Sequence, residues 1–143
     1  MQNLPSLIVG IGTDIVQIPR IEKLYAKFGE QFLLRNYHEL EIKDFWKLTK
    51  EKHCLFLAKR FAAKEAISKA FGLGIGAKMS FKEIAIFNDL RGAPSAKIFN
   101  KTASYLDNYS IYISLSDDYP VAIAFALVTK IGSPHELPPF GKF

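Results

Sequence analysis

Two short segments of the chain hold the residues that could do chemistry. Residues 10–20 place Asp14 at the end of an apolar run, and residues 61–76 place Glu65 between Lys64 and Lys69 ahead of a glycine-rich stretch. Mg²⁺ takes a few carboxylate oxygens from a protein and keeps waters and substrate phosphate as its other ligands. The two segments together therefore indicate a hard metal ion and a phosphate-bearing substrate.

The carboxylates also have simpler structural explanations. Asp14 is a candidate helix N-cap or turn residue, because Pro19 follows it and suits the first turn of a helix. Glu65 and Lys69 are four residues apart, the spacing of an ordinary helical ion pair worth about 0.2–0.5 kcal/mol. The local patterns leave both explanations open.

The glycine-rich stretch is similarly ambiguous. Gly72, Gly74 and Gly76 could let a backbone approach a phosphate, but the stretch lacks the lysine-threonine ending of a Walker loop and the Rossmann spacing. Gly72 also suits a helix C-cap.

The elements that must position these residues form an α+β pattern. The longest helix is predicted over residues 50–71, and its charges are mixed with five alanines instead of segregated, so we expect it to be largely covered with some charged groups facing a site. Before it we expect a buried strand whose glycines permit close approach or a bulge, and three shorter helices; after it we expect a hairpin, a short helix and two further strands. The predicted strands are 7–16, 81–87, 96–99, 111–116 and 121–128, and the last of these is predicted to be central in the sheet. The other predicted helices are 19–27, 31–35, 39–47 and 101–107, and a turn is predicted at 117–120.

This order of elements predicts one α+β domain over residues 1–130, with a long central helix packed on a mainly antiparallel sheet. Residues 131–143 contain three prolines and no periodicity, so we expect a flexible C-terminal tail.

Composition narrows the classes of function. The 143 residues carry a net charge of +5, which favours anionic partners. Residues 1–9 do not resemble a signal peptide, no apolar run is long enough for a membrane span, and Cys54 is the only cysteine, so we expect a cytoplasmic protein without a membrane role. The three histidines lie far apart, which argues against zinc.

A basic stripe lies on the first predicted helix. Arg20, Lys23 and Lys27 share a face with Leu24 beside them. Such a stripe is either a solvated surface or a docking face for an acidic protein helix.

A protein that binds an anionic partner such as RNA without catalysis is the alternative from another class. It would account for the positive charge but not for Asp14 and Glu65, because carboxylates repel phosphate unless a metal intervenes. The chain also has no long lysine or arginine block, so we expect no nucleic-acid partner.

Both motifs together resemble the small bacterial holo-[acyl-carrier-protein] synthases of the 4′-phosphopantetheinyl transferase superfamily. Members of that family carry a motif similar to G-[IL]-G-x-D-[IL]-x-x-x-x-R near the N-terminus, which residues 10–20 match here. About fifty residues later they carry a motif similar to [FW]-[AS]-x-K-E-A-x-x-K-A-x-G, which residues 61–72 match. The resemblance covers residues 7–129 and implies the 4′-phosphopantetheinyl transferase fold.

The resemblance also implies a reaction. It is the Mg²⁺-dependent transfer of 4′-phosphopantetheine from coenzyme A to a serine of acidic apo-acyl carrier protein, releasing adenosine 3′,5′-bisphosphate, in support of fatty acid biosynthesis. Asp14 and Glu65 would hold the metal, and Lys69 would act with them in catalysis. The serine proton would pass to Glu65 or to a metal-bound water.

Binding residues follow from the same resemblance. Arg60 and Lys64 would contact phosphates of coenzyme A, and Gly72, Gly74 and Gly76 would approach the nucleotide. The carrier protein would dock on Arg20, with Lys23, Leu24 and Lys27 extrapolated from helical spacing.

The chain departs from the family at Asp117, where the family usually has histidine. A non-catalytic binder of coenzyme A or of another anionic partner is therefore the alternative. The resemblance further implies a homotrimer with sites between subunits. Phe81, Phe87 and Phe99 could serve that interface or belong to the core.

Overall fold

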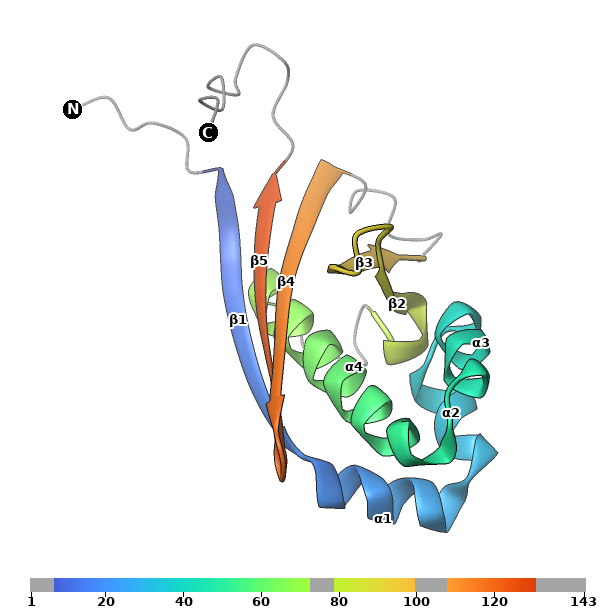
Figure 1. Cartoon of the computed structure of the whole chain (residues 1–143). Coiled ribbons are helices and arrows are strands. Elements are labelled where there is room, and N and C mark those ends of the chain that lie inside the picture. Colours follow the sequence, from blue (N-terminus) through green and yellow to red (C-terminus); the bar gives the residue numbers. More distant parts are fainter. Residues whose placement is uncertain (1–6, 73–78, 100–107, 131–143) are drawn as a thin grey trace, which may run out of the picture.

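The computed structural model describes residues 7–72, 79–99 and 108–130 (Figure 1). It has the α+β architecture that the order of elements predicts. Its elements are β1 (Ile8–Gln17), α1 (Ile18–Phe28), α2 (Glu30–Asn36), α3 (Glu39–Lys47), α4 (Lys50–Phe71), the 3₁₀ turn η1 (Phe81–Glu83), β2 (Ile84–Asn88), β3 (Pro94–Ile98), β4 (Tyr109–Asp118) and β5 (Val121–Lys130).

The main sheet is antiparallel, with strands in the order β1-β5-β4. β5 is central, as its strongly apolar sequence predicts. Ala122, Ala124, Ala126 and Val128 of this strand are fully buried and face α4. β2 and β3 form a separate antiparallel hairpin beside α4 (Figure 1).

Helix α4 lies against the sheet at very short range because the contact is made by glycine and alanine. A Cβ atom added to Gly10 would lie 2.0 Å from the carbonyl oxygen of Ala70, and one added to Gly12 would lie 2.0 Å from that of Ala66. These two glycines therefore allow the backbones of β1 and α4 to touch, as the sequence predicts. A register irregularity between Ile8 and Gly10 adds the expected bulge.

The helix ends follow from local residues. Pro19 occupies the first turn of α1, and α1 ends at Gly29 in a conformation with φ 56°. His38 caps α3 through a reciprocal capping box with Glu41. Gly72 ends α4 in the left-handed conformation, with φ 70°, so the predicted C-cap is confirmed.

The structure corrects two of the predicted elements. Residues 81–87 are not one strand, because Phe81–Glu83 form a 3₁₀ turn in which the Glu83 side chain accepts a hydrogen bond from the Ser80 N–H at 2.9 Å. Asp117 and Asp118 belong to β4, and the turn to β5 is confined to Tyr119 and Pro120. The predicted helix at 101–107 and the predicted tail at 131–143 lie outside the described residues.

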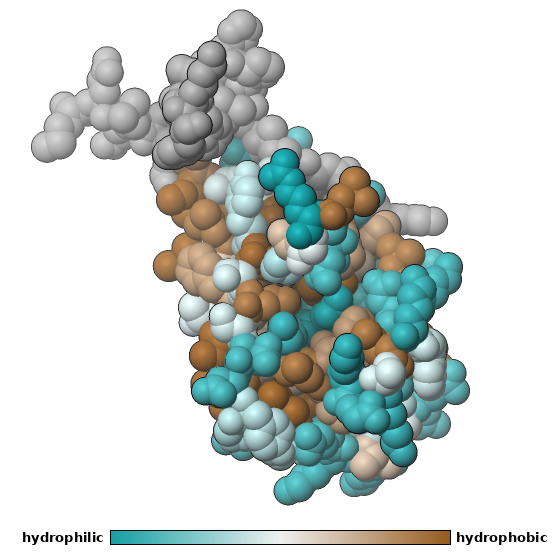
Figure 2. All heavy atoms as spheres, viewed as in Figure 1, coloured by the Kyte–Doolittle hydropathy of each residue, from teal (hydrophilic) through white to brown (hydrophobic). Residues whose placement is uncertain are grey.

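The outer face of the main sheet is apolar and uncovered in the single chain. Ile11 and Ile15 of β1 are 62% and 63% exposed, and Tyr112, Ile123 and Phe125 continue the patch across β4 and β5. Figure 2 shows apolar residues gathered along this side of the molecule. Of the phenylalanines considered for an interface, Phe81 lies in the core and Phe99 is exposed.

Among the described helices, none is both long enough and apolar enough to cross a membrane.

Candidate active site

The motif carboxylates come from β1 and α4, two elements whose backbones pack closely together. Asp14 lies on β1, two residues after Gly12, and Glu65 lies on α4, one residue before Ala66. The close packing of Gly12 on Ala66 therefore brings the two carboxylates to the same edge of the sheet. Their proximity is evident in the electrostatics, because the Asp14 charge helps to raise the pKa of Glu65.

Lys69 joins this group. Its Nζ donates to Oδ1 of Asp14 at 3.1 Å and to the carbonyl oxygen of Thr13 at 2.9 Å. Lys69 thus pairs across two elements, where helical spacing alone suggested Glu65 as its partner. The Lys69 side chain is 54% exposed, which leaves its ammonium accessible to an anion.

Burial is the main cause of the raised pKa of Glu65, and the negative charge of Asp14 adds to it. The positive charges of Lys69 and Arg20 act in the opposite direction. A cation placed against both carboxylates would relieve this repulsion. The donor set suits Mg²⁺, because two carboxylates leave room for waters and substrate oxygens. Within the described ranges, no group of three or more His, Cys, Asp and Glu side chains offers a more complete protein site.

Lys64 directly precedes Glu65 on α4 and is fully buried. It forms an ion pair with Glu41, which is also fully buried. Burial lowers the pKa of Lys64 to about 8, and the Glu41 charge opposes that change. The ammonium uses its remaining donors on the carbonyl oxygens of Asn36, at 2.9 Å, and Phe81, at 3.0 Å. The expected phosphate contact of Lys64 therefore has no counterpart in this structure.

Arg60 is also turned inward. Its guanidinium lies 3.6 Å from the centroid of the Phe56 ring, and its Nε is buried without a hydrogen-bond partner among the described residues. Burial lowers the pKa of Arg60. Because the side chain is only 7% exposed, the structure does not present Arg60 to a nucleotide. The sequence could not separate these inward cations from the outward Lys69, since all three lie on one helix.

The predicted nucleotide loop is described only at its start. Gly72 is exposed at the C-terminal end of α4. Gly74 and Gly76 lie outside the described residues.

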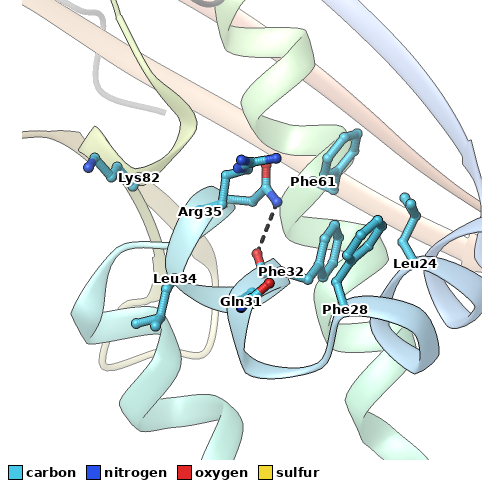
Figure 3. A pocket seen from close by; sticks show the side chains of 9 residues that line it. Leu24, Phe28, Gln31, Phe32, Leu34, Arg35, Phe61 and Lys82 are labelled. Atoms are coloured by element: carbon cyan, nitrogen blue, oxygen red, sulfur yellow. Dashed lines mark hydrogen bonds between the residues drawn. The ribbon is translucent and has the colours of Figure 1, made fainter.

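A groove of about 960 Å³ opens beside α1 and α2. Its apolar lining comes from Leu24 and Phe28 of α1, Phe32 of α2 and Phe61 of α4. Figure 3 shows these side chains on one side of the groove, with Lys82 of η1 on the other side beyond Arg35.

The predicted basic stripe borders this groove. Arg20, Lys23 and Lys27 are exposed along α1, and the Arg20 guanidinium lies 6.0 Å from the centroid of the Phe61 ring. Arg20 is also one of the charges that lower the pKa of Glu65. The stripe therefore extends from the carboxylate site toward the groove.

Asp117 has a partner that the sequence did not suggest. Its Oδ1 lies 3.0 Å from Nζ of Lys59 on α4. Both side chains are about one-third exposed, so the extra carboxylate is neutralised by a neighbouring cation. Glu41, the partner of Lys64, was likewise not predicted from the sequence. Glu41 lies three residues after the N-cap of α3, which is a capping-box position, and this signal could have identified it.

Comparison with known proteins agrees with this fold. Residues 10–124 match the family described as the 4′-phosphopantetheinyl transferase superfamily. The chain is 43% identical over 128 residues to the holo-[acyl-carrier-protein] synthase of Orientia tsutsugamushi (strain Ikeda), covering 86% of this chain and 98% of that protein.

Solved structures agree as well. The holo-[acyl-carrier-protein] synthase from Neisseria meningitidis has a TM-score of 0.79 and 38% identity, covering 86% of this chain and 99% of that one. The synthase from Bacillus anthracis str. Ames, solved in complex with CoA (3′,5′-ADP), has a TM-score of 0.76 and 35% identity, covering 87% and 99%. The chain belongs to the 4′-phosphopantetheinyl transferase superfamily. The predicted fold, the predicted resemblance to holo-[acyl-carrier-protein] synthases and the prediction of an enzyme of that kind are confirmed.

Proposed function

We propose that this protein transfers the 4′-phosphopantetheine group from coenzyme A to a serine of apo-acyl carrier protein in a Mg²⁺-dependent reaction that supports fatty acid biosynthesis in the cytoplasm. The observation that carries the proposal is the convergence of Asp14 of β1 with Glu65 and Lys69 of α4 at one accessible edge. The relatives named as holo-[acyl-carrier-protein] synthases support it, and one of them is solved with CoA.

The chemistry is a phosphoryl-group transfer. The serine Oγ forms a bond to the phosphorus that bears the pantetheine, and the bond from that phosphorus to the oxygen of the leaving adenosine 3′,5′-bisphosphate breaks. Mg²⁺ held by Asp14 and Glu65 would neutralise charge on the pyrophosphate. Lys69, which is paired with Asp14, would stabilise charge on the leaving phosphate. Glu65 is the chain's own candidate to accept the serine proton, because its carboxylate lies at the edge of the sheet where the reacting phosphate would bind.

The carrier protein is assigned to the groove and its basic border. An acidic amphipathic helix matches this surface, because its apolar side chains can contact Leu24, Phe28 and Phe61 while its carboxylates meet Arg20 and Lys27. Arg35 and Lys82, which also line the groove, add positive charge. Lys23, exposed on α1, adds charge outside the lining.

A homotrimer with sites completed between subunits is part of the proposal. The uncovered apolar face of the β1-β5-β4 sheet supports a second copy of this chain as the covering partner, because isolated proteins rarely expose apolar patches this continuous. Replacing Ile15 by Glu should yield a smaller species in analytical ultracentrifugation and reduce transfer. A wild-type protein that is monomeric and fully active would contradict the shared site.

The decisive test is the intact mass of an apo-acyl carrier protein after incubation with this protein, CoA and Mg²⁺. A gain of one phosphopantetheine group that EDTA prevents is expected. Asp14→Ala and Glu65→Ala should each lower the rate about a thousandfold or more, in keeping with the several kcal/mol that metal stabilisation of a transition state supplies, while circular dichroism stays unchanged. CoA binding without mass gain by a folded wild-type protein would favour a non-catalytic binder.

A further inference from the structure

The buried ion pair between Lys64 and Glu41 connects more of the molecule than any exposed pair does among the described residues. The Lys64 ammonium has three N–H donors, and it uses them on Glu41, on the carbonyl oxygen of Asn36 and on that of Phe81. Asn36 is the last residue of α2, and Phe81 is the first residue of η1. One side chain of α4 thus holds the ends of two other elements.

Glu41 extends the network to two more segments. Its Oε2 accepts from the backbone N–H of His38 at 2.8 Å, and its Oε1 accepts from that of Ile86 at 3.2 Å. His38 is the N-cap of α3, and Ile86 lies in β2. Apolar residues of similar volume can stabilise a core as well as a buried ion pair does, so stability alone is a weak reason for such a pair.

The residues held by Lys64 adjoin the charged wall of the groove. Asn36 follows Arg35, and Phe81 precedes Lys82. Arg35 and Lys82 both line the groove, with Lys82 on the side away from the rings of Phe28 and Phe61 and Arg35 between them (Figure 3). On α4, Lys64 immediately precedes Glu65. The same lysine therefore contacts both segments that carry the groove cations and belongs to the helical turn that carries a site carboxylate.

We infer that Lys64, oriented by Glu41, is a positioning residue that fixes the Arg35–Lys82 wall of the groove relative to Glu65. This inference rests on the proposed function, in which the groove receives the carrier protein. Lys64 does not contact either substrate in this role. It sets the distance between the surface that docks the carrier and the carboxylates at which the carrier serine reacts.

The test compares two nearly isosteric variants in steady-state transfer assays. Glu41→Gln keeps Lys64 in contact with both carbonyl oxygens, so its KM for carrier protein should stay within about threefold of wild type. Lys64→Met combined with Glu41→Gln removes that contact without leaving a buried charge, and its KM for carrier protein should rise about tenfold or more. The KM for CoA should change less than about twofold in both. Lys47→Met with Asp44→Asn, an exposed pair on α3, is the matched control and should match wild type.

Each result decides the inference. A folded K64M/E41Q variant with a wild-type KM for carrier protein, or one that raises only the KM for CoA, overturns it. Because the double variant could fail to fold, Arg35→Ala and Lys82→Ala are measured as well, since both side chains are exposed. If neither raises the KM for carrier protein, the wall has no role to position and the inference is wrong. Wild-type transfer in the same assay distinguishes this failure from failure of the proposed function.

Discussion

Two of the lysine–carboxylate pairs made by helix α4 have opposite character. Lys69 pairs with Asp14 at the edge of the sheet, where the two side chains are 54% and 16% exposed. Lys64 pairs with Glu41 in the core, where both are 0% exposed. The lysines are five residues apart in one motif, so their chemistry is the same and only the face of the helix differs. The comparison shows that burial, not residue type, separates the group that can meet a phosphate from the group that holds the protein together.

The difference has an energetic basis. An exposed pair gains little, because water screens the charges and competes for them. A buried pair has lost its hydration, so each charge depends on its partner and on the carbonyl and N–H groups around it. Lys69 can therefore exchange partners at a small cost, whereas Lys64 cannot leave Glu41 without a large cost.

The largest expected effect follows directly from this comparison. Lys64→Met should lower the free energy of unfolding by about 3–5 kcal/mol, because it leaves the Glu41 carboxylate buried without its counter-charge. Lys69→Met should lower it by no more than about 1 kcal/mol, because its pair is half exposed. Urea unfolding at a common slope measures both. Equal losses of unfolding free energy in the two variants would contradict the distinction between the buried and the exposed pair.

The contact between β1 and α4 provides the second prediction. Gly12→Ala should destabilise the protein by about 1–3 kcal/mol, because its Cβ would meet the Ala66 carbonyl oxygen at 2.0 Å and the backbones must separate. Transfer should fall as well, since the shift moves Asp14 away from Glu65. Lys52→Ala, at an exposed position in the first turn of α4, is the control. Unfolding and transfer rates measured together check both effects. A Gly12→Ala protein with wild-type stability would show that the close packing is dispensable.

Some of this arrangement could be predicted from sequence. The bounds of α3 and α4, the Gly72 cap, the central position of β5 and the glycine contact with α4 all follow from local patterns or spacing. The inward direction of Lys64 could not be predicted, because Glu41, its partner, lies 23 residues away on another helix. Asp117 is similar, since its pairing with Lys59 depends on how β4 is placed beside α4. Contacts between residues far apart in the sequence determine whether these charged side chains are buried and which partners they have.

Arg20 of α1 is a further exposed cation, and its substitution tests whether exposed charges serve binding. Arg20→Glu should raise the KM for carrier protein about tenfold, equivalent to about 1.4 kcal/mol, because it reverses a charge on the proposed docking face. The KM for CoA should change much less. Lys43→Glu, which reverses another exposed charge on α3, is the matched control. Steady-state transfer assays at fixed ionic strength give both constants. An unchanged carrier KM would place the docking face elsewhere.

The smallest expected effect on stability concerns His38, whose backbone N–H donates to Glu41 of the buried pair. His38 caps α3 through Nδ1, which accepts from the Leu40 N–H at 3.2 Å and must be unprotonated to do so. Burial lowers the pKa of His38, with the charge of Lys64 adding to this and that of Glu39 opposing it. Between the folded pKa and the ordinary value near 6.5, the unfolded chain binds more protons. The His38 contribution to stability is therefore complete above about 6.5 and is lost as the pH falls through the folded pKa.

His38→Asn should remove this dependence, because asparagine keeps an N-cap acceptor but does not titrate. Wild type should lose up to about 1 kcal/mol more than the variant between pH 7.5 and pH 5, measured by urea unfolding. Glu39→Gln serves as a control for the neighbouring carboxylate, which opposes the lowering of the His38 pKa. Identical pH profiles for wild type and His38→Asn would mean that the cap survives protonation. Protonation of His38 would then leave the Lys64–Glu41 pair unaffected, although the backbone N–H of His38 donates to Glu41.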